Sequence, residues 1–158
     1  MLKKEKTVIG RSERIAFPIL GFEDIPARID TGAGISAIGV QSVTEYDGRL
    51  EVVFFDVASP LFTGKKQSFS SFGKTEVRSS NGQSALRYTI RTQVVLGGRK
   101  IRATFTLADR STQLYPVLIG RNVLRGKFIV DVKLGTSLAA EKQRQAEIKA
   151  KYSASSKE

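Results

Sequence analysis

Apolar and polar residues alternate along several short segments of the chain, which predicts β-strands with one buried face. The clearest alternation places Val94 and Leu96 before a glycine pair, and Ile101, Ala103 and Phe105 after it. The segments predicted as strands are 7–10, 14–17, 25–30, 50–57, 74–78, 86–96, 100–107 and 116–119. Many short strands in 158 residues indicate an all-β protein with one compact domain.

Turn and loop residues separate these strands. Gly97-Gly98 between two alternating segments predicts a two-residue hairpin, and Asn81-Gly82 predicts a second turn. The segment 64–73 is polar and rich in Ser and Lys, so we expect an exposed loop there. A polar turn is expected after Val40.

Helical segments are few. We expect a single turn at 121–124 and a longer helix within 137–151, where Ala, Glu, Lys and Gln are good helix formers. Residues 153–158 are expected to be disordered. The expected organisation is a basic N-terminal tail (1–6), a main domain (7–136) and a C-terminal helical or disordered tail (137–158).

The composition excludes several kinds of chemistry. The chain has no Cys and no His, so it offers no Cys nucleophile, no Ser-His-Asp triad, no disulfide and no zinc site built from these ligands. Asp, Glu, Ser, Thr, Lys, Tyr and Arg remain as catalytic candidates. No segment approaches the ~20 apolar residues of a membrane helix, and no apolar core follows the first lysines. We therefore expect a cytoplasmic protein without a membrane partner.

The charge of the chain is strongly positive. Lys and Arg total 26 against 15 Asp and Glu, which gives a net charge of +11. Residues 1–6 and 139–158 carry +2 each, so the body keeps +7. A basic body predicts an acidic partner such as nucleic acid, a ribosome or an acidic peptide. The alternative is a basic surface that only keeps the protein soluble.

Three other motifs carry little weight. Residues 32–37 match the spacing of the dinucleotide fingerprint, but no long helix follows them. Residues 68–75 nearly match a phosphate-binding loop, but Ser68 replaces its first Gly and a strand follows. No Ser-x-x-Lys pair lies at a convincing strand-to-helix turn. We expect neither ATP nor a dinucleotide as a cofactor.

Two separated motifs are more informative together. Asp30-Thr31-Gly32 follows a predicted strand, and an apolar segment ending in Gly120-Arg121 follows about 90 residues later. With the predicted Asn81-Gly82 hairpin between them, the pair resembles the retropepsin-like aspartic proteases. This resemblance implies a closed β-barrel or sandwich with a flap hairpin, one short helix and an Asp-Thr-Gly active-site loop.

A closer resemblance is to bacterial RimB-type proteins. It is carried by the segments Arg-Ser-Ser-Asn-Gly (78–82), Leu-Gly-Gly (96–98), Thr-Leu-Ala-Asp-Arg (106–110) and Tyr-Pro-Val-Leu-Ile-Gly-Arg (115–121). Members of this family commonly carry an Arg where this chain has Gly34, and often a His near Gly39. Many are labelled ATP-dependent zinc proteases, but this chain offers neither zinc ligands nor a phosphate loop. We therefore expect no cofactor and no metal.

The resemblance also implies a role for each site residue. An aspartic protease needs two carboxylates, and this chain offers one Asp-Thr-Gly, so Asp30 is expected to meet its symmetry mate in a C2 homodimer. The implied active-site loop is Thr31, Gly32 and Ala33, its support is Ile119, Gly120 and Arg121, and the flap is Ser79, Ser80, Asn81 and Gly82. Thr31 is expected to lock the two loops across the dimer axis, and Arg121 to be structural.

The expected substrate is acidic. RimB-type proteins are associated with a ligase that adds glutamates to the C-terminus of a small-subunit ribosomal protein, and with the removal of those glutamates. Arg78 and Arg87 flank the predicted flap and are candidates for carboxylate recognition, or simply exposed charges on strands. Two alternatives stay open: a non-catalytic basic barrel that binds RNA or the ribosome, and a retropepsin fold without peptidase activity.

Overall fold

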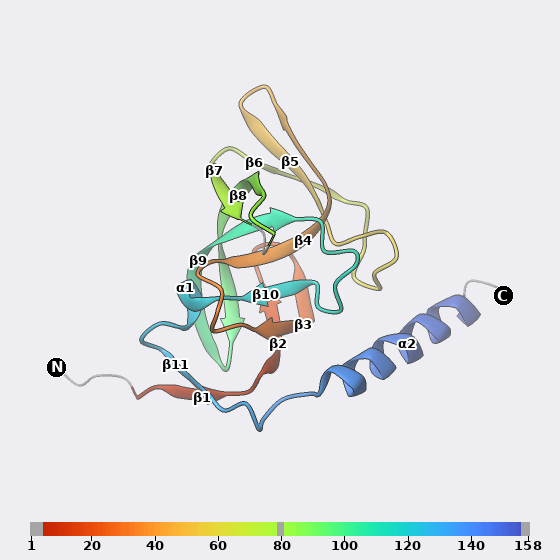
Figure 1. Cartoon of the computed structure of the whole chain (residues 1–158). Helices are drawn as coiled ribbons and strands as arrows, with labels where there is room; N and C mark the ends of the chain where they lie inside the picture. Colours follow the sequence, from red (N-terminus) through yellow and green to blue (C-terminus); the bar gives the residue numbers. More distant parts are fainter. Residues whose placement is uncertain (1–4, 79–80, 156–158) are drawn as a thin grey trace.

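The computed structural model describes residues 5–78 and 81–155 (Figure 1). Its strands are β1 (Thr7–Ile9), β2 (Ser12–Phe17), β3 (Phe22–Ile29), β4 (Ser36–Tyr46), β5 (Arg49–Phe54), β6 (Lys66–Phe69), β7 (Gly73–Arg78), β8 (Ser84–Leu96), β9 (Arg99–Ala108), β10 (Val117–Ile119) and β11 (Phe128–Val130). Its helices are α1 (Arg121–Leu124) and α2 (Leu138–Ser155).

The central strands close into a barrel. Neighbours are hydrogen-bonded in the order β10-β3-β2-β8-β9-β4, and β10 also pairs with β4, which completes the ring. This arrangement confirms the predicted all-β closed barrel with a short helix and a C-terminal helix. A closed barrel leaves no open sheet edge around the core.

The core follows the alternation seen in the sequence. Val94, Leu96, Ile101, Ala103 and Phe105 are all buried, as one face of the β8–β9 hairpin. Leu96 pairs with Arg99 across the tight turn. Gly97 and Gly98 in that turn have φ angles of 56° and 76°, a backbone conformation that glycine adopts without strain. The predicted hairpin is confirmed.

Strand β10 has a special place in the barrel, because it lies between β3 and β4. It runs parallel to β3, with Leu118 opposite Arg28, and antiparallel to β4, with Leu118 opposite Ala37. The loop that joins β3 to β4 contains Asp30. The end of β10 therefore lies directly against this loop.

Strand β4 replaces the polar turn that we expected after Val40. Residues 36–40 are buried within the barrel, whereas residues 44–46 are exposed and pair only with β5. This outer half of β4 is held by backbone hydrogen bonds of a protruding hairpin (Figure 1), so its side chains need no apolar alternation.

The expected loop at 64–73 and the region near residue 128 also contain strands. Strand β6 pairs with β5 through Leu50 and Phe69, and the Phe69 ring lies 6.1 Å from that of Phe54. Strand β11 pairs in parallel with β1, where Val8 lies opposite Ile129. Such short strands depend on partners that are distant in sequence, which local patterns do not reveal.

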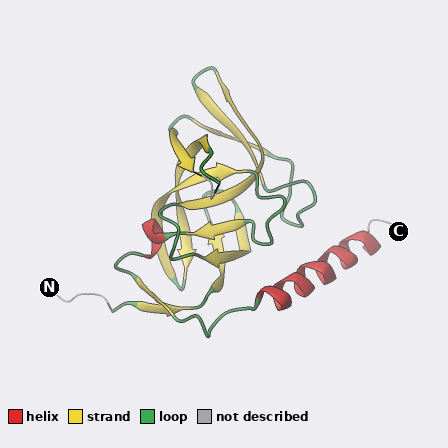
Figure 2. Ribbon diagram, viewed as in Figure 1, coloured by secondary structure: helices red, strands yellow, loops and turns green. Residues whose placement is uncertain are grey.

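Helix α2 is longer than expected and is attached to the barrel. It continues to Ser155, so residues 153–155 are helical rather than disordered, and 156–158 lie outside the described residues. Glu141 is buried and accepts a hydrogen bond from Gln145 Nε2 (2.9 Å), which also donates to the carbonyl of Leu114 (2.8 Å). Figure 2 shows the far end of the helix extending away from the barrel.

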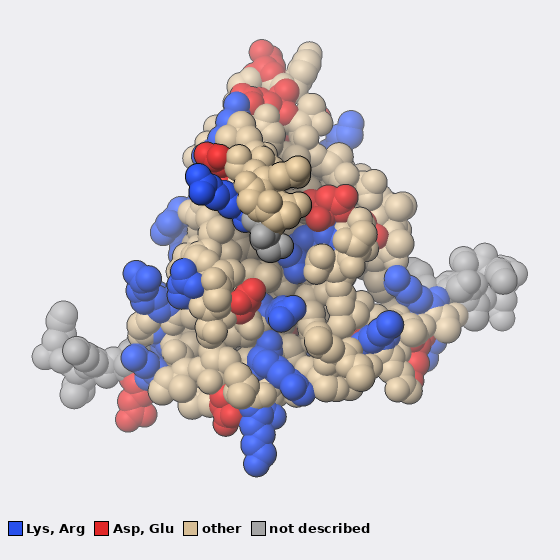
Figure 3. Space-filling model, viewed as in Figure 1, with Lys and Arg blue, Asp and Glu red and all other residues tan. Residues whose placement is uncertain are grey.

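Acidic and basic side chains are unevenly distributed. In Figure 3 the acidic groups gather at the tip of the β4–β5 hairpin, and basic groups are spread over the barrel below it. Within the described part of the chain, no helix is long and apolar enough to cross a membrane.

Candidate active site

The Asp30 side chain is held in one orientation by its own loop. Its Oδ1 accepts a hydrogen bond from the backbone N–H of Gly32 (2.9 Å), and its carbonyl accepts one from Ala33 (3.2 Å). The N–H of Asp30 donates to the carbonyl of Ile119 at the end of β10 (2.8 Å). Asp30 is half-buried, whereas Thr31 and Gly32 are exposed. The carboxylate is therefore fixed at an accessible surface.

Gly120 allows the two segments to approach closely. A Cβ atom at this position would lie 2.8 Å from the carbonyl oxygens of both Ala33 and Ile35. Such a contact is too short for a real side chain, so only glycine fits here without moving the loop. The sequence motif contains this glycine because the backbone of the loop occupies the space of its side chain.

Arg121 is bonded to the loop through backbone oxygens. Its Nη1 donates to the carbonyl of Thr31 (3.0 Å), and its N–H donates to the carbonyl of Ala33 (2.8 Å). A Cβ on Gly34 would lie 3.4 Å from Arg121 Nη2, so an acidic side chain at position 34 would face the guanidinium. In this chain, the guanidinium of Arg121 bonds the carbonyl of Thr31 instead.

A polar network that we did not predict lies behind the loop. Ser36 Oγ accepts from the N–H of Gly120 (2.8 Å) and donates to Asn122 Oδ1 (2.8 Å). Asn122 Oδ1 also accepts from the N–H of Ser36 (3.0 Å), and its Nδ2 donates to the carbonyl of Thr104 (2.8 Å). This network joins β4, β9 and α1. In the sequence, the only indication of a role for Asn122 was its position directly after the Gly-Arg pair.

The predicted flap is a hairpin of β7 and β8. Arg78 lies opposite Ser84 at its outer end, and Gly82 in the turn has a φ of 81°. Asn81 Oδ1 accepts from the N–H of Gln83 (3.2 Å). Ser79 and Ser80 lie outside the described residues. The turn signal at Asn81-Gly82 is thus confirmed as a hairpin.

Three arginines from different elements, Arg28, Arg87 and Arg110, interact through their charges, and Arg110 also interacts with Asp30. Burial lowers the pKa of Arg110, and the positive charges of Arg87 and Arg28 lower this pKa further. The Asp30 carboxylate opposes this effect and raises the pKa of Arg110. The Arg110 guanidinium is held by a hydrogen bond from Nε to the carbonyl of Tyr115 (3.0 Å). The site therefore combines one carboxylate with a local excess of positive charge.

Of these three arginines, only Arg87 was predicted to have a role in substrate recognition. Arg87, one of the two candidates for carboxylate recognition, belongs to this cluster, and Arg78 is exposed at the far end of β7. Arg110 was noted in a family-like segment without a role, and Arg28 was not singled out. Their shared environment depends on the fold, although Arg28 lies only two residues before Asp30, near the end of β3.

Metal ligands are not clustered in the described residues. Within 5–78 and 81–155, no group of three or more His, Cys, Asp or Glu side chains could hold a metal ion.

The geometry is that of a retropepsin-like fold: an Asp-Thr-Gly loop lies against the buried end of β10 and Gly120, in a closed barrel with a hairpin. Comparison with known proteins agrees with this class. Residues 8–141 match the RimB-like family, described as "Retropepsin-like aspartic endopeptidase RimB", and the chain belongs to this family.

Two relatives and one solved structure are similar to the chain at 21% to 31% sequence identity. Proteins named "Probable alpha-L-glutamate ligase" match from Shewanella pealeana (31% identical, 82% of this chain and 29% of the relative) and from Parasynechococcus marenigrum (29%, 90% and 31%). This chain thus spans less than a third of their length. A Legionella pneumophila protein of unknown function shares the fold, with a TM-score of 0.64 at 21% identity over 84% of this chain and 98% of that one.

Proposed function

We propose that this protein is an aspartic endopeptidase that acts as a C2 homodimer and cuts acidic, glutamate-rich peptide segments. The observation that carries the proposal is the Asp30 carboxylate, which is held by Gly32 at an accessible surface on a buried support. The single Asp-Thr-Gly of the chain supplies half of the two-carboxylate site that this chemistry needs.

In the proposed dimer, the Asp30 carboxyls of two copies share one proton beside a water molecule. The ionised carboxylate takes a proton from the water, whose oxygen attacks the scissile carbonyl carbon. The protonated carboxyl donates a hydrogen bond to the carbonyl oxygen. The tetrahedral intermediate then breaks at the C–N bond, and the amine leaves with a proton from the dyad. The hairpin of β7 and β8 would cover the substrate and exclude water.

Three observations support an acidic substrate. The body of the chain carries +7, and Arg110, which interacts with Asp30, also interacts with the charges of Arg28 and Arg87. The region shared with this chain forms part of longer proteins named as glutamate ligases. The family description of the matching region is that of a peptidase, so we assign the peptidase rather than the ligase chemistry to this chain. A glutamylated ribosomal protein tail, with docking on the ribosome, fits this charge.

The decisive experiment measures cleavage of a synthetic peptide that ends in glutamates, followed by mass spectrometry. We expect the wild-type chain to cut it, and Asp30→Asn to abolish cleavage with an unchanged thermal unfolding curve. Asp47→Asn is the matched control, because it removes a carboxylate from an exposed turn far along the β4–β5 hairpin. Equal loss of activity in both variants would contradict the role of Asp30.

Mixing the variants tests the dimer. If each active site needs two Asp30 residues, an equal mixture of wild-type and Asp30→Asn chains retains about a quarter of the activity after subunit exchange. A monomeric enzyme would retain about half. Retention of half the activity at concentrations where sedimentation shows a dimer would refute the shared dyad.

A further inference from the structure

A groove lies between residues 110–115 and α2, along the stretch of the helix from Leu138 to Lys149. Its volume is about 540 Å³. Four of its lining side chains are basic and none is acidic: Arg28, Arg110, Lys142 and Lys149. Its remaining polar lining comes from uncharged side chains such as Ser111, Thr112, Gln113 and Gln145.

The basic side chains of this groove form no ion pair in the described residues, although the Asp30 carboxylate acts on the charge of Arg110. In the described part of the chain, the ion pairs join Arg14 to Asp24 and Glu141, Lys74 to Glu45, and Arg144 to Glu141. None of the four basic groups of the groove belongs to this set. Gathering like charges in one groove is unfavourable unless an anion occupies it.

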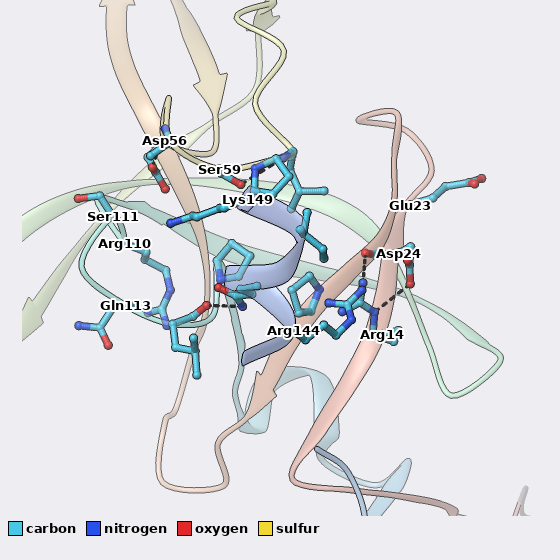
Figure 4. Close-up of a pocket in the computed structure, with 18 residues that line it drawn as sticks. Arg14, Glu23, Asp24, Asp56, Ser59, Arg110, Ser111, Gln113, Arg144 and Lys149 are labelled. Carbon is cyan, nitrogen blue, oxygen red and sulfur yellow. Dashed lines mark hydrogen bonds and ion pairs between the residues drawn. The ribbon is translucent and has the colours of Figure 1, made fainter. Parts of the chain in front are cut away.

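A neighbouring cavity on the same helix provides the contrast (Figure 4). Its lining includes Glu23, Asp24 and Asp56 beside its basic residues, and the Arg14–Asp24 ion pair (2.8 Å) lies within it. That cavity has four basic and three acidic side chains, and two of the basic ones, Arg110 and Lys149, also line the groove. Of the two, only the groove lined by Arg28 has basic side chains and no acidic ones.

Two lining residues relate the groove to Asp30. Arg28 lines the groove and lies two positions before Asp30 along the chain. Arg110 also lines it, and its guanidinium is close enough to Asp30 for their charges to interact. On this basis we expect a peptide bound at Asp30 to extend into the groove.

The spacing of the lysines sets the length of the ligand. Lys142 and Lys149 are seven residues apart on α2, which places them on one face and about 10 Å apart along the axis. An extended peptide covers this distance in about three residues. A run of about four acidic residues thus reaches from one lysine to the other, with Arg28 and Arg110 on the side of the active site.

We propose that the groove of Arg28, Arg110, Lys142 and Lys149 binds consecutive carboxylates of the substrate chain, outside the bond that is cut. This inference rests on the proposed peptidase function and names where the acidic segment is held. A peptide fits better than RNA, because the aromatic residue that lines the groove, Tyr115, is buried and offers no ring for base stacking.

The test measures binding separately from cleavage. Fluorescent octaglutamate, octaglutamine and diglutamate peptides are titrated into the full chain carrying Asp30→Asn, with anisotropy as the readout. Lys142→Gln/Lys149→Gln is compared with Lys65→Gln/Lys66→Gln, which removes the same charge from exposed positions on another part of the surface. All four lysines are exposed, so both double variants are expected to fold, and thermal unfolding checks this.

We expect octaglutamate to bind about tenfold more weakly to the groove variant and less than twofold more weakly to the control. Octaglutamine and diglutamate should bind weakly to every variant. Equal weakening in both double variants, no binding of octaglutamate to the parent chain, or tighter binding of a single-stranded RNA of equal charge would each overturn the proposal. Cleavage that depends on Asp30 without a groove effect would refute the groove and leave the peptidase function standing.

Discussion

The Asp30 loop and the β7–β8 hairpin, which we propose as the two sides of the active site, are supported in opposite ways. Behind the loop, Ser36 is fully buried and the Gly120 backbone lies in contact with the loop itself. The hairpin is tied at its base, where Glu45 bonds Tyr88 (3.0 Å) and Lys74 (3.2 Å), whereas residues 81–86 are exposed. The proposed catalytic group thus lies on a well-packed support, and the proposed cover is an exposed hairpin, as entry of a peptide would require.

The largest effect is expected for Gly120→Ala, which changes the support of the Asp30 loop. The new Cβ would lie 2.8 Å from two backbone oxygens, so the loop must shift. We expect a loss of about 3 kcal/mol of unfolding free energy and of cleavage activity, measured by chemical denaturation and peptide hydrolysis. A Cβ at Gly82 in the hairpin turn would meet no atom within 4 Å, so only the φ of 81° opposes Gly82→Ala. We expect this variant to lose about 1–2 kcal/mol of unfolding free energy. A larger effect at Gly82 would reverse the comparison.

Ser36→Ala tests the polar network alone. It leaves the buried N–H of Gly120 without its acceptor and removes one donor from Asn122, which should cost about 1–3 kcal/mol. Ser84→Ala, at an exposed position of the hairpin, should change the unfolding free energy by less than about 0.5 kcal/mol. The same small change in both variants would mean that the network does not stabilise the loop.

The same contrast explains which features the sequence could reveal. Asp30 was found because Asp-Thr-Gly resembles a family motif, and Gly120 because it belongs to the paired motif, where the backbone has no room for a side chain. The β8–β9 hairpin was found because alternation and a glycine pair are local signals. Strand β6 was missed because it is polar and depends on β5 for pairing, and the role of Arg110 was missed because Arg28, Arg87 and Asp30 reach it from other strands.

The smallest expected effect concerns the base of the hairpin and its response to pH. Hydrogen bonds from Lys74, and then from Tyr88, lower the pKa of Glu45 below its ordinary value of 4.5. Because the folded pKa is the lower one, this contact stabilises the hairpin above pH 4.5 and is lost as the pH falls through the folded value. We expect hydrogen-exchange protection of the β7 and outer β8 amides, corrected for intrinsic rates, to fall over that range while the β8–β9 core stays protected. Glu45→Gln should remove this pH dependence, and Glu76→Gln, an exposed change on β7, should leave it intact. A pH response that survives Glu45→Gln would show that another group controls the hairpin.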